Sequence, residues 1–173
     1  MCIEIGSMAD IVTAITAVLG VGISLFTWIR NMKIEKDKSI KDFFRETNET
    51  PDAAEVFRKI DYEKKWYGKK FHNSEFEKKV DKVLIRYTFF IDLLNDGYVD
   101  IQKSNWINYE IYRVLSNHDT QAYLFNLRNF TNSKKIPFPY KSLVDYGISI
   151  GVLDETFFNV EYGEIKYGKI LDW

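Results

Sequence analysis

The chain has 173 residues, with 24 lysines and arginines against 25 aspartates and glutamates, and a formal net charge of -1. This length allows one domain with a real core and excludes a large multidomain enzyme. A single cysteine, Cys2, excludes a disulfide framework and a structural zinc site and fits a reducing compartment. An aromatic content of 16% excludes a disordered chain.

The charges are distributed unevenly along the chain. Residues 1–29 contain no lysine or arginine and only two acidic residues, so residues 30–173 hold all 24 basic residues and 23 acidic ones, a net charge of +1. Within the apolar leader, residues 11–29 are nineteen residues without a charge. At about 1.5 Å per residue they span about 28 Å, close to the thickness of the hydrocarbon core of a bilayer. We therefore predict one transmembrane helix over 11–29.

The flanks of this segment predict its orientation. Trp28 lies where an interfacial aromatic belongs, and the basic residues all follow the segment, namely Arg30, Lys33, Lys36, Lys38 and Lys41. We expect a single-pass protein of the inner (plasma) membrane, with its N-terminus outside and residues 34–173 in the cytoplasm. The acidic start and bulky end are not those of a cleaved signal peptide. The alternative is a buried core helix of a soluble protein.

Small and hydroxyl-bearing residues gather on one face of the predicted membrane helix. At about 100° per residue they fall within an arc of about 80°; they are Thr13, Thr16, Gly20, Ser24 and Thr27. Gly22 lies opposite. Such a face favours helix association and hence a homo-oligomer, and a ring of such faces can line a pore. The alternative is that the hydroxyls satisfy carbonyls of their own helix.

The rest of the chain is predicted to be mainly α. The strongest pattern covers residues 74–95, where apolar residues recur every three or four positions. Ser74 and Glu77 have the spacing of a capping box, and Gly97 supplies a stop. A helix over 34–46 is expected to continue the membrane helix as a stalk.

Four further helices are expected, over residues 52–67, 104–115, 119–131 and 140–146. Pro51 suits the start of the first, Asp119 is a candidate cap of the third, and Gly147 is expected to end the last.

The last seventeen residues, 157–173, lack the helical pattern of the preceding segments. β-leaning runs separated by Gly163 and Gly168 fit either a short β-hairpin or an ordered tail. The chain thus divides into an N-terminal segment with its membrane helix (1–33), a stalk helix and linker (34–50), a helical cytosolic domain (51–156) and the tail or hairpin (157–173).

No catalytic constellation is recognised. The two histidines, His72 and His118, have no second histidine or cysteine at metal-ligand spacing, and no glycine-rich phosphate loop or nucleophile elbow occurs. We therefore predict no enzyme activity, no metal and no cofactor.

One segment is distinctive in charge. Residues 58–71 carry six basic residues against two acidic ones, interleaved with aromatic rings. Lysines beside flat rings suit an anionic ligand such as short single-stranded nucleic acid, because phosphates meet the lysines while a ring stacks on a base. The candidate ligand-binding residues are Lys64, Lys65, Trp66, Tyr67, Lys69 and Lys70. The alternative is a solvated helix end whose aromatics belong to the core, which the small net charge of the cytosolic part favours.

The whole architecture resembles that of a loose group of bacterial membrane-anchored helical proteins. The residues concerned are the runs Arg113-Val114-Leu115-Ser116-Asn117, Tyr123-Leu124 and Pro137-Phe138-Pro139-Tyr140, together with the membrane helix and stalk. Similarly built proteins include membrane effectors of anti-phage systems of the Hailong type. The resemblance implies a homo-oligomeric channel held closed by a small nucleic-acid signal. It carries no functional residue over to this chain.

Three functions remain open from the sequence. The first is a homo-oligomeric membrane effector that depolarises the membrane and is gated through its cytosolic domain by a ligand or a regulatory protein. The second is a membrane-tethered binding or scaffold module without channel activity. The third, a tethered enzyme, needs a cluster of polar residues that the sequence does not display.

Overall fold

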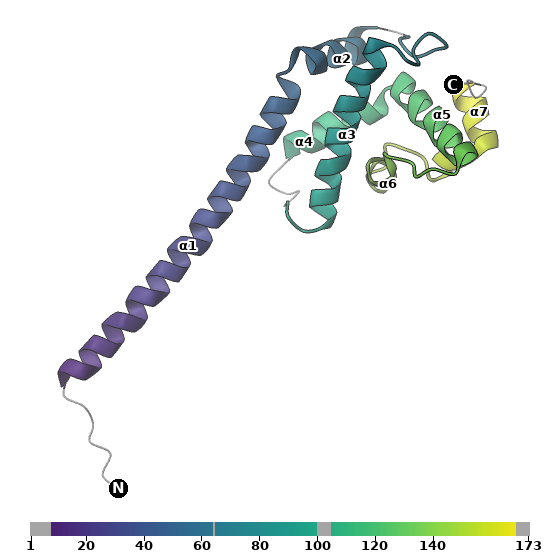
Figure 1. Ribbon diagram of the computed structural model, residues 1–173. Helices are drawn as coiled ribbons and strands as arrows, with labels where there is room; N and C mark the ends of the chain where they lie inside the picture. The colour runs from purple at the N-terminus through teal and green to yellow at the C-terminus, as the bar shows by residue number, and fades with distance from the viewer. Residues whose placement is uncertain (1–7, 64, 100–104, 169–173) are drawn as a thin grey trace. The chain divides into compact units, whose positions relative to one another are not determined.

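The computed structural model describes the backbone of residues 8–63, 65–99 and 105–168, with their side chains except those of 8–21, 36, 37, 44, 47 and 105. The fold is mainly α, as predicted, and Figure 1 traces the helices along the chain. Two compact units are present, Met1–Arg45 and Glu46–Trp173.

Helix α1 (Met8–Asn48) is one unbroken helix of 41 residues. It contains the predicted membrane segment together with the charged residues that follow, because nothing between them breaks the helix before Asn48. Among the residues described, no helix is both long enough and apolar enough to cross a membrane. The side chains of residues 11–21 of the predicted span lie outside the described residues.

Helices α2 (Pro51–Tyr62) and α3 (Glu75–Asn95) begin at well-formed caps. The Thr50 hydroxyl accepts the Ala53 amide hydrogen at 3.2 Å, and the Ser74 hydroxyl accepts that of Glu77 at 3.1 Å. In the capping box of α3, the bond from the Glu77 amide to the Ser74 hydroxyl forms as the sequence pattern implies, but the reciprocal bond does not. The Glu77 carboxylate accepts the amide of the residue before the cap instead. Past the end of α3, Gly97 has φ 74°, which suits a glycine stop.

The prediction that α2 runs to residue 67 is wrong. The helix ends at Tyr62, and Glu63 has an extended backbone. Beyond this point the backbone amides of Trp66 and Tyr67 donate to the side chain of Asp119, so they are not available to helix hydrogen bonds. A tertiary contact thus overrides the local helical pattern.

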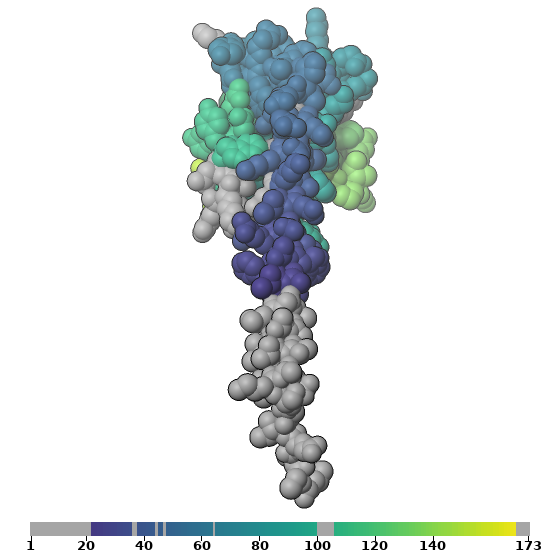
Figure 2. All heavy atoms as spheres, turned by 90° about the vertical axis from the view of Figure 1, so that its left-hand side faces the viewer, coloured from purple at the N-terminus to yellow at the C-terminus, as the bar shows by residue number. Residues whose placement is uncertain are grey.

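Helices α4 (Asn105–Ser116) and α5 (His118–Lys134) are joined by one residue, Asn117. Asn117, and not Asp119, caps α5: its side-chain oxygen accepts the Thr120 amide hydrogen at 2.9 Å. Helix α5 is the central helix of the domain, because its residues 119–127 are all buried. Helix α4 presents part of its surface to solvent, and Figure 2 shows its side chains at the surface of the domain.

Helix α6 (Lys141–Ser149) continues through the glycine that was expected to end it. Gly147 is buried inside the helix, where a Cβ would lie 2.8 Å from a methyl carbon of Leu115 and 2.9 Å from one of Leu153. Gly147 therefore serves close packing. The chain turns at Gly151 instead, which has φ 72°.

The β-hairpin alternative for the C-terminus is wrong for the residues described. Residues Glu155–Phe158 form a short 3₁₀ helix, η2, and Val160–Tyr167 form helix α7. Asn159 caps α7 by accepting the Tyr162 amide hydrogen at 3.0 Å, which supplies the helix start that the β-leaning composition concealed. Gly163 faces the ring of Phe125 on α5, and only a residue without a side chain fits there.

The core of the domain lies where α3 and α5 meet the surrounding helices. Helix α3 packs against α2 and α6, while α5 packs against α4 and α7. One carboxylate, that of Asp81 on α3, accepts the hydroxyl hydrogens of Tyr123 at 2.6 Å and Tyr140 at 2.7 Å. These two bonds join α3, α5 and the segment before α6 inside the domain.

Candidate ligand-binding site

The candidate site is formed by residues 63–74, the connection between α2 and α3, which we call the basic loop. Its Lys64 lies outside the described residues. The loop turns back on itself through two backbone bonds, from Phe71 N to Gly68 O at 2.8 Å and from Ser74 N to Phe71 O at 3.1 Å. Asn73 has φ 63°, a left-handed conformation that asparagine tolerates better than most residues.

The basic loop, with the end of α2 and the start of α3, borders an open surface pocket of about 510 Å³. This volume lies in the range of small-molecule sites. Four lysines, four aromatic residues, a glycine and a serine line it: Lys59, Lys65, Trp66, Tyr67, Gly68, Lys69, Lys70, Phe71, Ser74 and Phe76. We call this cavity the basic aromatic pocket.

The lysines of the pocket differ in how their charges are compensated. Lys59 is half-buried, with its Nζ 2.7 Å from Glu63 Oε2 and 4.8 Å from the centre of the Phe76 ring. Lys65, Lys69 and Lys70 are exposed, and within the described part of the chain none of them has a carboxylate within ion-pair distance. Three ammonium groups at the pocket thus have no carboxylate partner among the residues described, which suits them to an external anion.

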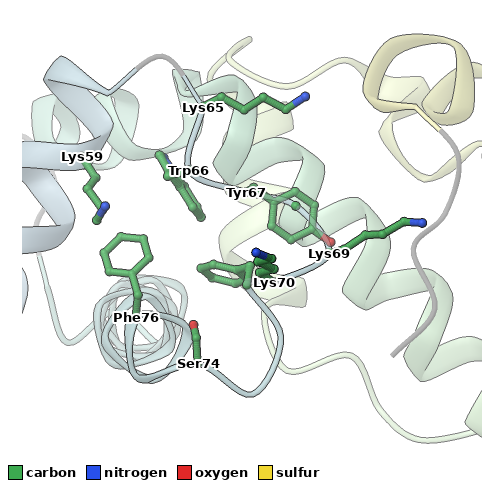
Figure 3. A pocket seen from close by; sticks show the side chains of 10 residues that line it. Lys59, Lys65, Trp66, Tyr67, Lys69, Lys70, Ser74 and Phe76 are labelled. Atoms are coloured by element: carbon green, nitrogen blue, oxygen red, sulfur yellow. The ribbon is translucent and has the colours of Figure 1, made fainter.

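The aromatic wall of the pocket is centred on Trp66. Its ring lies 5.3 Å from that of Phe71 and 5.6 Å from that of Phe76, centre to centre. Figure 3 shows Lys59 pointing toward Phe76 to the left of Trp66, whereas Lys65 and Lys69 extend to the right, with their ammonium ends directed away from the Trp66 ring. The Trp66 Nε1 is buried and has no hydrogen-bond partner among the described residues.

Tyr67 belongs to the core as well as to the pocket, because only 6% of it is exposed. Its hydroxyl lies 3.2 Å from Nε2 of His72, whose Nδ1 lies 3.1 Å from a carboxylate oxygen of Glu77. Burial first, and then the charges of Glu77 and Asp119, raise the pKa of the Tyr67 hydroxyl. A ring held in this way is not free to stack on a ligand base, so among the predicted residues Trp66 is the better placed to do so.

Five of the six predicted ligand-binding residues line this one pocket, and the sixth is Lys64. The sequence prediction did not name the other five lining residues, Lys59, Gly68, Phe71, Ser74 and Phe76. Lys59 was within reach of sequence reasoning, since it belongs to the same basic segment. Ser74 and Phe76 carry no local signal, because the turn of the loop brings them to the pocket.

The predicted helix-association face is described only in part. Ser24 and Thr27 are exposed on α1. For Thr13, Thr16 and Gly20 only the helical backbone is described. Self-association through this face stays a prediction.

Over the described residues, no three or more His, Cys, Asp or Glu side chains are grouped so as to hold a metal ion. No protein-family model, no curated protein sequence and no solved structure matches this chain.

Proposed function

We propose that the chain is a single-pass protein of the bacterial inner membrane whose cytosolic helical domain binds an anionic ligand in the basic aromatic pocket. The observation that carries the proposal is the gathering of three lysines without carboxylate partners among the described residues around one cavity walled by aromatic rings. Such a site pairs phosphates with ammonium groups and a flat base with Trp66. Short single-stranded nucleic acid is the ligand class that this combination fits best.

The membrane half of the proposal rests on the sequence. Residues 11–29 carry no charge, and basic residues follow them closely. The same helix, α1, continues to Asn48, three residues before α2 begins. We propose that the chains form a homo-oligomer through the face of Thr13, Gly20 and Ser24, and that the ligand, or a regulatory protein, gates a channel that depolarises the membrane. The biological role is then that of an effector in abortive anti-phage defence.

A second candidate is a membrane-tethered binding or scaffold module without a channel. It is favoured by three aromatic side chains on α4 that face solvent, with 41% of Trp106, 64% of Tyr109 and 55% of Tyr112 exposed. Tryptophan and tyrosine are enriched at protein–protein contacts. A protein partner on α4 with no change in membrane potential is the signature of this candidate.

Ligand binding is tested on the full chain in detergent, with fluorescently labelled single-stranded oligonucleotides and anisotropy as the readout. We expect binding at low salt that weakens as salt rises. Replacing Lys65, Lys69 and Lys70 by glutamate should abolish it and leave the oligomer mass unchanged. The matched control changes the same total charge at three exposed lysines elsewhere, Lys134, Lys135 and Lys141.

Two results would refute the proposed site. One is the absence of oligonucleotide binding to the wild-type chain at low salt, where phosphate contacts are strongest. The other is an equal loss of binding in the control variant, which would mean that overall charge, and not the pocket, attracts the ligand.

A further inference from the structure

The basic loop carries three of the four pocket lysines, Lys65, Lys69 and Lys70, but has no helix or strand of its own among its described residues to hold it. Its backbone is attached to the rest of the domain by side chains. Near its end, the Glu77 carboxylate binds His72 and the Asn73 amide. Near its beginning, the attachment is Asp119 of α5, a residue more than 50 positions away in sequence.

Asp119 makes two bonds to the loop from a single oxygen. Its Oδ2 accepts the backbone amide hydrogen of Trp66 and, at 2.9 Å, that of Tyr67. Only 7% of Asp119 is exposed, so these amides are held in a largely dry environment, where charge-assisted hydrogen bonds are strong. Both amides belong to pocket residues, and Lys65 directly precedes them.

Asp119 lies in the first turn of α5, where a negative charge interacts favourably with the helix dipole, but it is not the cap of that helix. A carboxylate in the first turn of a helix often serves as its cap, but α5 is capped by Asn117. The second oxygen of Asp119 lies 3.6 Å from Nδ1 of His118, an exposed side chain. The main hydrogen bonds of Asp119 are therefore those to the basic loop.

We propose that Asp119 is a positioning residue of the basic aromatic pocket. It fixes the backbone at Trp66 and Tyr67, so that the indole wall and the lysines on both sides of it keep one arrangement before a ligand arrives. Preorganisation of this kind raises affinity because the ligand does not have to order the loop. This inference rests on the proposed binding of an anionic ligand by the pocket.

For the substitution Asp119→Asn, a positioning role and simple electrostatic attraction predict opposite changes in the affinity for an anionic ligand. Asp119→Asn removes a negative charge beside a basic site, and Coulomb attraction alone would then strengthen the binding of an anion. The asparagine side chain is a weaker acceptor for the two amides, so loss of positioning weakens binding. We expect the affinity for a single-stranded oligonucleotide to fall about tenfold in Asp119→Asn, and further in Asp119→Ala.

The matched control is Glu63→Gln. Like Asp119→Asn, it removes one negative charge beside the pocket, but Glu63 makes no bond to the amides of Trp66 and Tyr67. The substitution also releases Lys59 from its 2.7 Å ion pair. Affinity should therefore rise in this variant. A fall in Asp119→Asn beside a rise in Glu63→Gln, measured on the full chain in the same detergent and salt, supports the assignment.

A second measurement needs no ligand and guards against variants that fail to fold. Hydrogen exchange at the amides of Trp66 and Tyr67 should be slow in the wild-type chain and fast in Asp119→Asn, while the amides of α3 stay protected in both. Fast exchange of these two amides in the wild-type chain would overturn the inference. So would an Asp119→Asn variant that binds as tightly as the wild type or more tightly. If the wild-type chain binds no oligonucleotide at all, the proposed function fails first and this inference fails with it.

Discussion

Six tyrosine hydroxyls among the described residues of the domain have their pKa raised by their surroundings, and four of them are among its most buried groups. The pKa values of Tyr67, Tyr87, Tyr123 and Tyr140 are all raised, first by burial and then by the charge of a nearby carboxylate. For Tyr123 and Tyr140 this carboxylate is Asp81, which also accepts their hydroxyl hydrogens. Each of these tyrosines therefore keeps its proton more firmly in the folded chain than in the unfolded one.

This shift predicts how stability depends on pH. Above pH 10, the ordinary pKa of tyrosine, the unfolded chain releases protons that the folded chain retains, so the free energy of unfolding falls as pH rises. Each such tyrosine contributes about 1.4 kcal/mol per pH unit to that slope. Below pH 10 these tyrosines are protonated in both the folded and the unfolded chain, so their contribution to the free energy of unfolding does not change with pH.

The variant Tyr123→Phe tests the prediction, with urea unfolding of the full chain in detergent between pH 9 and pH 11. Its free energy of unfolding should fall less steeply above pH 10 than that of the wild type, by about 1.4 kcal/mol per pH unit. Equal slopes in the two proteins would mean that Tyr123 ionises as readily in the folded state as in the unfolded one.

Residues that act locally were the ones that sequence reasoning assigned correctly. Ser74 caps α3 because its hydroxyl needs only an amide three residues away. Asp119 was expected to act in the same local way, and its real partners are amides of the basic loop. Gly147 is predicted from the sequence to end a helix, but in the structure it allows close packing against Leu115 and Leu153. No local pattern distinguishes these uses.

At the scale of elements, α7 shows how packing decides between helix and strand. Its β-leaning composition fitted a hairpin or an ordered tail, but the segment is a helix whose buried residue is Gly163, packed directly against the ring of Phe125 on α5. Tyr167 adds a hydroxyl bond to Gln121 at 3.0 Å, and the Lys166 carbonyl lies 3.2 Å from Nε2 of His118. The helix is therefore held by its contacts with α5 and with the short 3₁₀ helix η2.

We expect Gly163→Ala to destabilise the domain. A Cβ at this position would lie 2.0 Å from Cε2 of Phe125, a buried ring without room to move, so α7 has to shift away from α5. Overpacking of this kind costs about 1–3 kcal/mol, although alanine alone is favoured over glycine in a helix by about 1 kcal/mol.

Urea unfolding and hydrogen exchange in α7 measure the effect. The control is Gly68→Ala, where a Cβ meets nothing within 4 Å, and its stability should stay within about 0.5 kcal/mol of the wild type. A stabilised Gly163→Ala variant would contradict the close packing of α7 on α5.

At the scale of the whole molecule, the helical class and most helices follow from the sequence because periodicity and caps are short-range signals. The pocket follows only in part. Its lysines and Trp66 are neighbours in sequence, whereas Phe76 and the anchor Asp119 reach the site through the fold. The sequence predicts α2 to extend to residue 67, whereas the helix ends at Tyr62. Contacts made through the fold, which a local pattern does not contain, place the residues that follow in the basic loop.

The effector proposal depends on the predicted membrane segment, residues 11–29. If the proposed effector is correct, expression of the wild-type chain alone in bacteria should depolarise the membrane and stop growth, because no ligand is present to hold the oligomer closed. Gly20→Leu places a bulky side chain on the predicted association face and should abolish both effects by holding the helices apart. A ligand can gate such an oligomer only through different affinities for its open and closed arrangements.

The matched control is Gly22→Leu, because Gly22 lies on the opposite face of the predicted helix and a Cβ there meets nothing within 4 Å. It should depolarise as the wild type does, and its oligomer mass in detergent should be unchanged, whereas Gly20→Leu should shift the mass toward the monomer. If the two variants behave alike, the prediction that the helices associate through the face that contains Gly20 is wrong. Unchanged membrane potential with a monomeric wild-type chain would leave the tethered binding module as the better account, since an anchor needs no partner helix to hold a ligand-binding domain at the membrane.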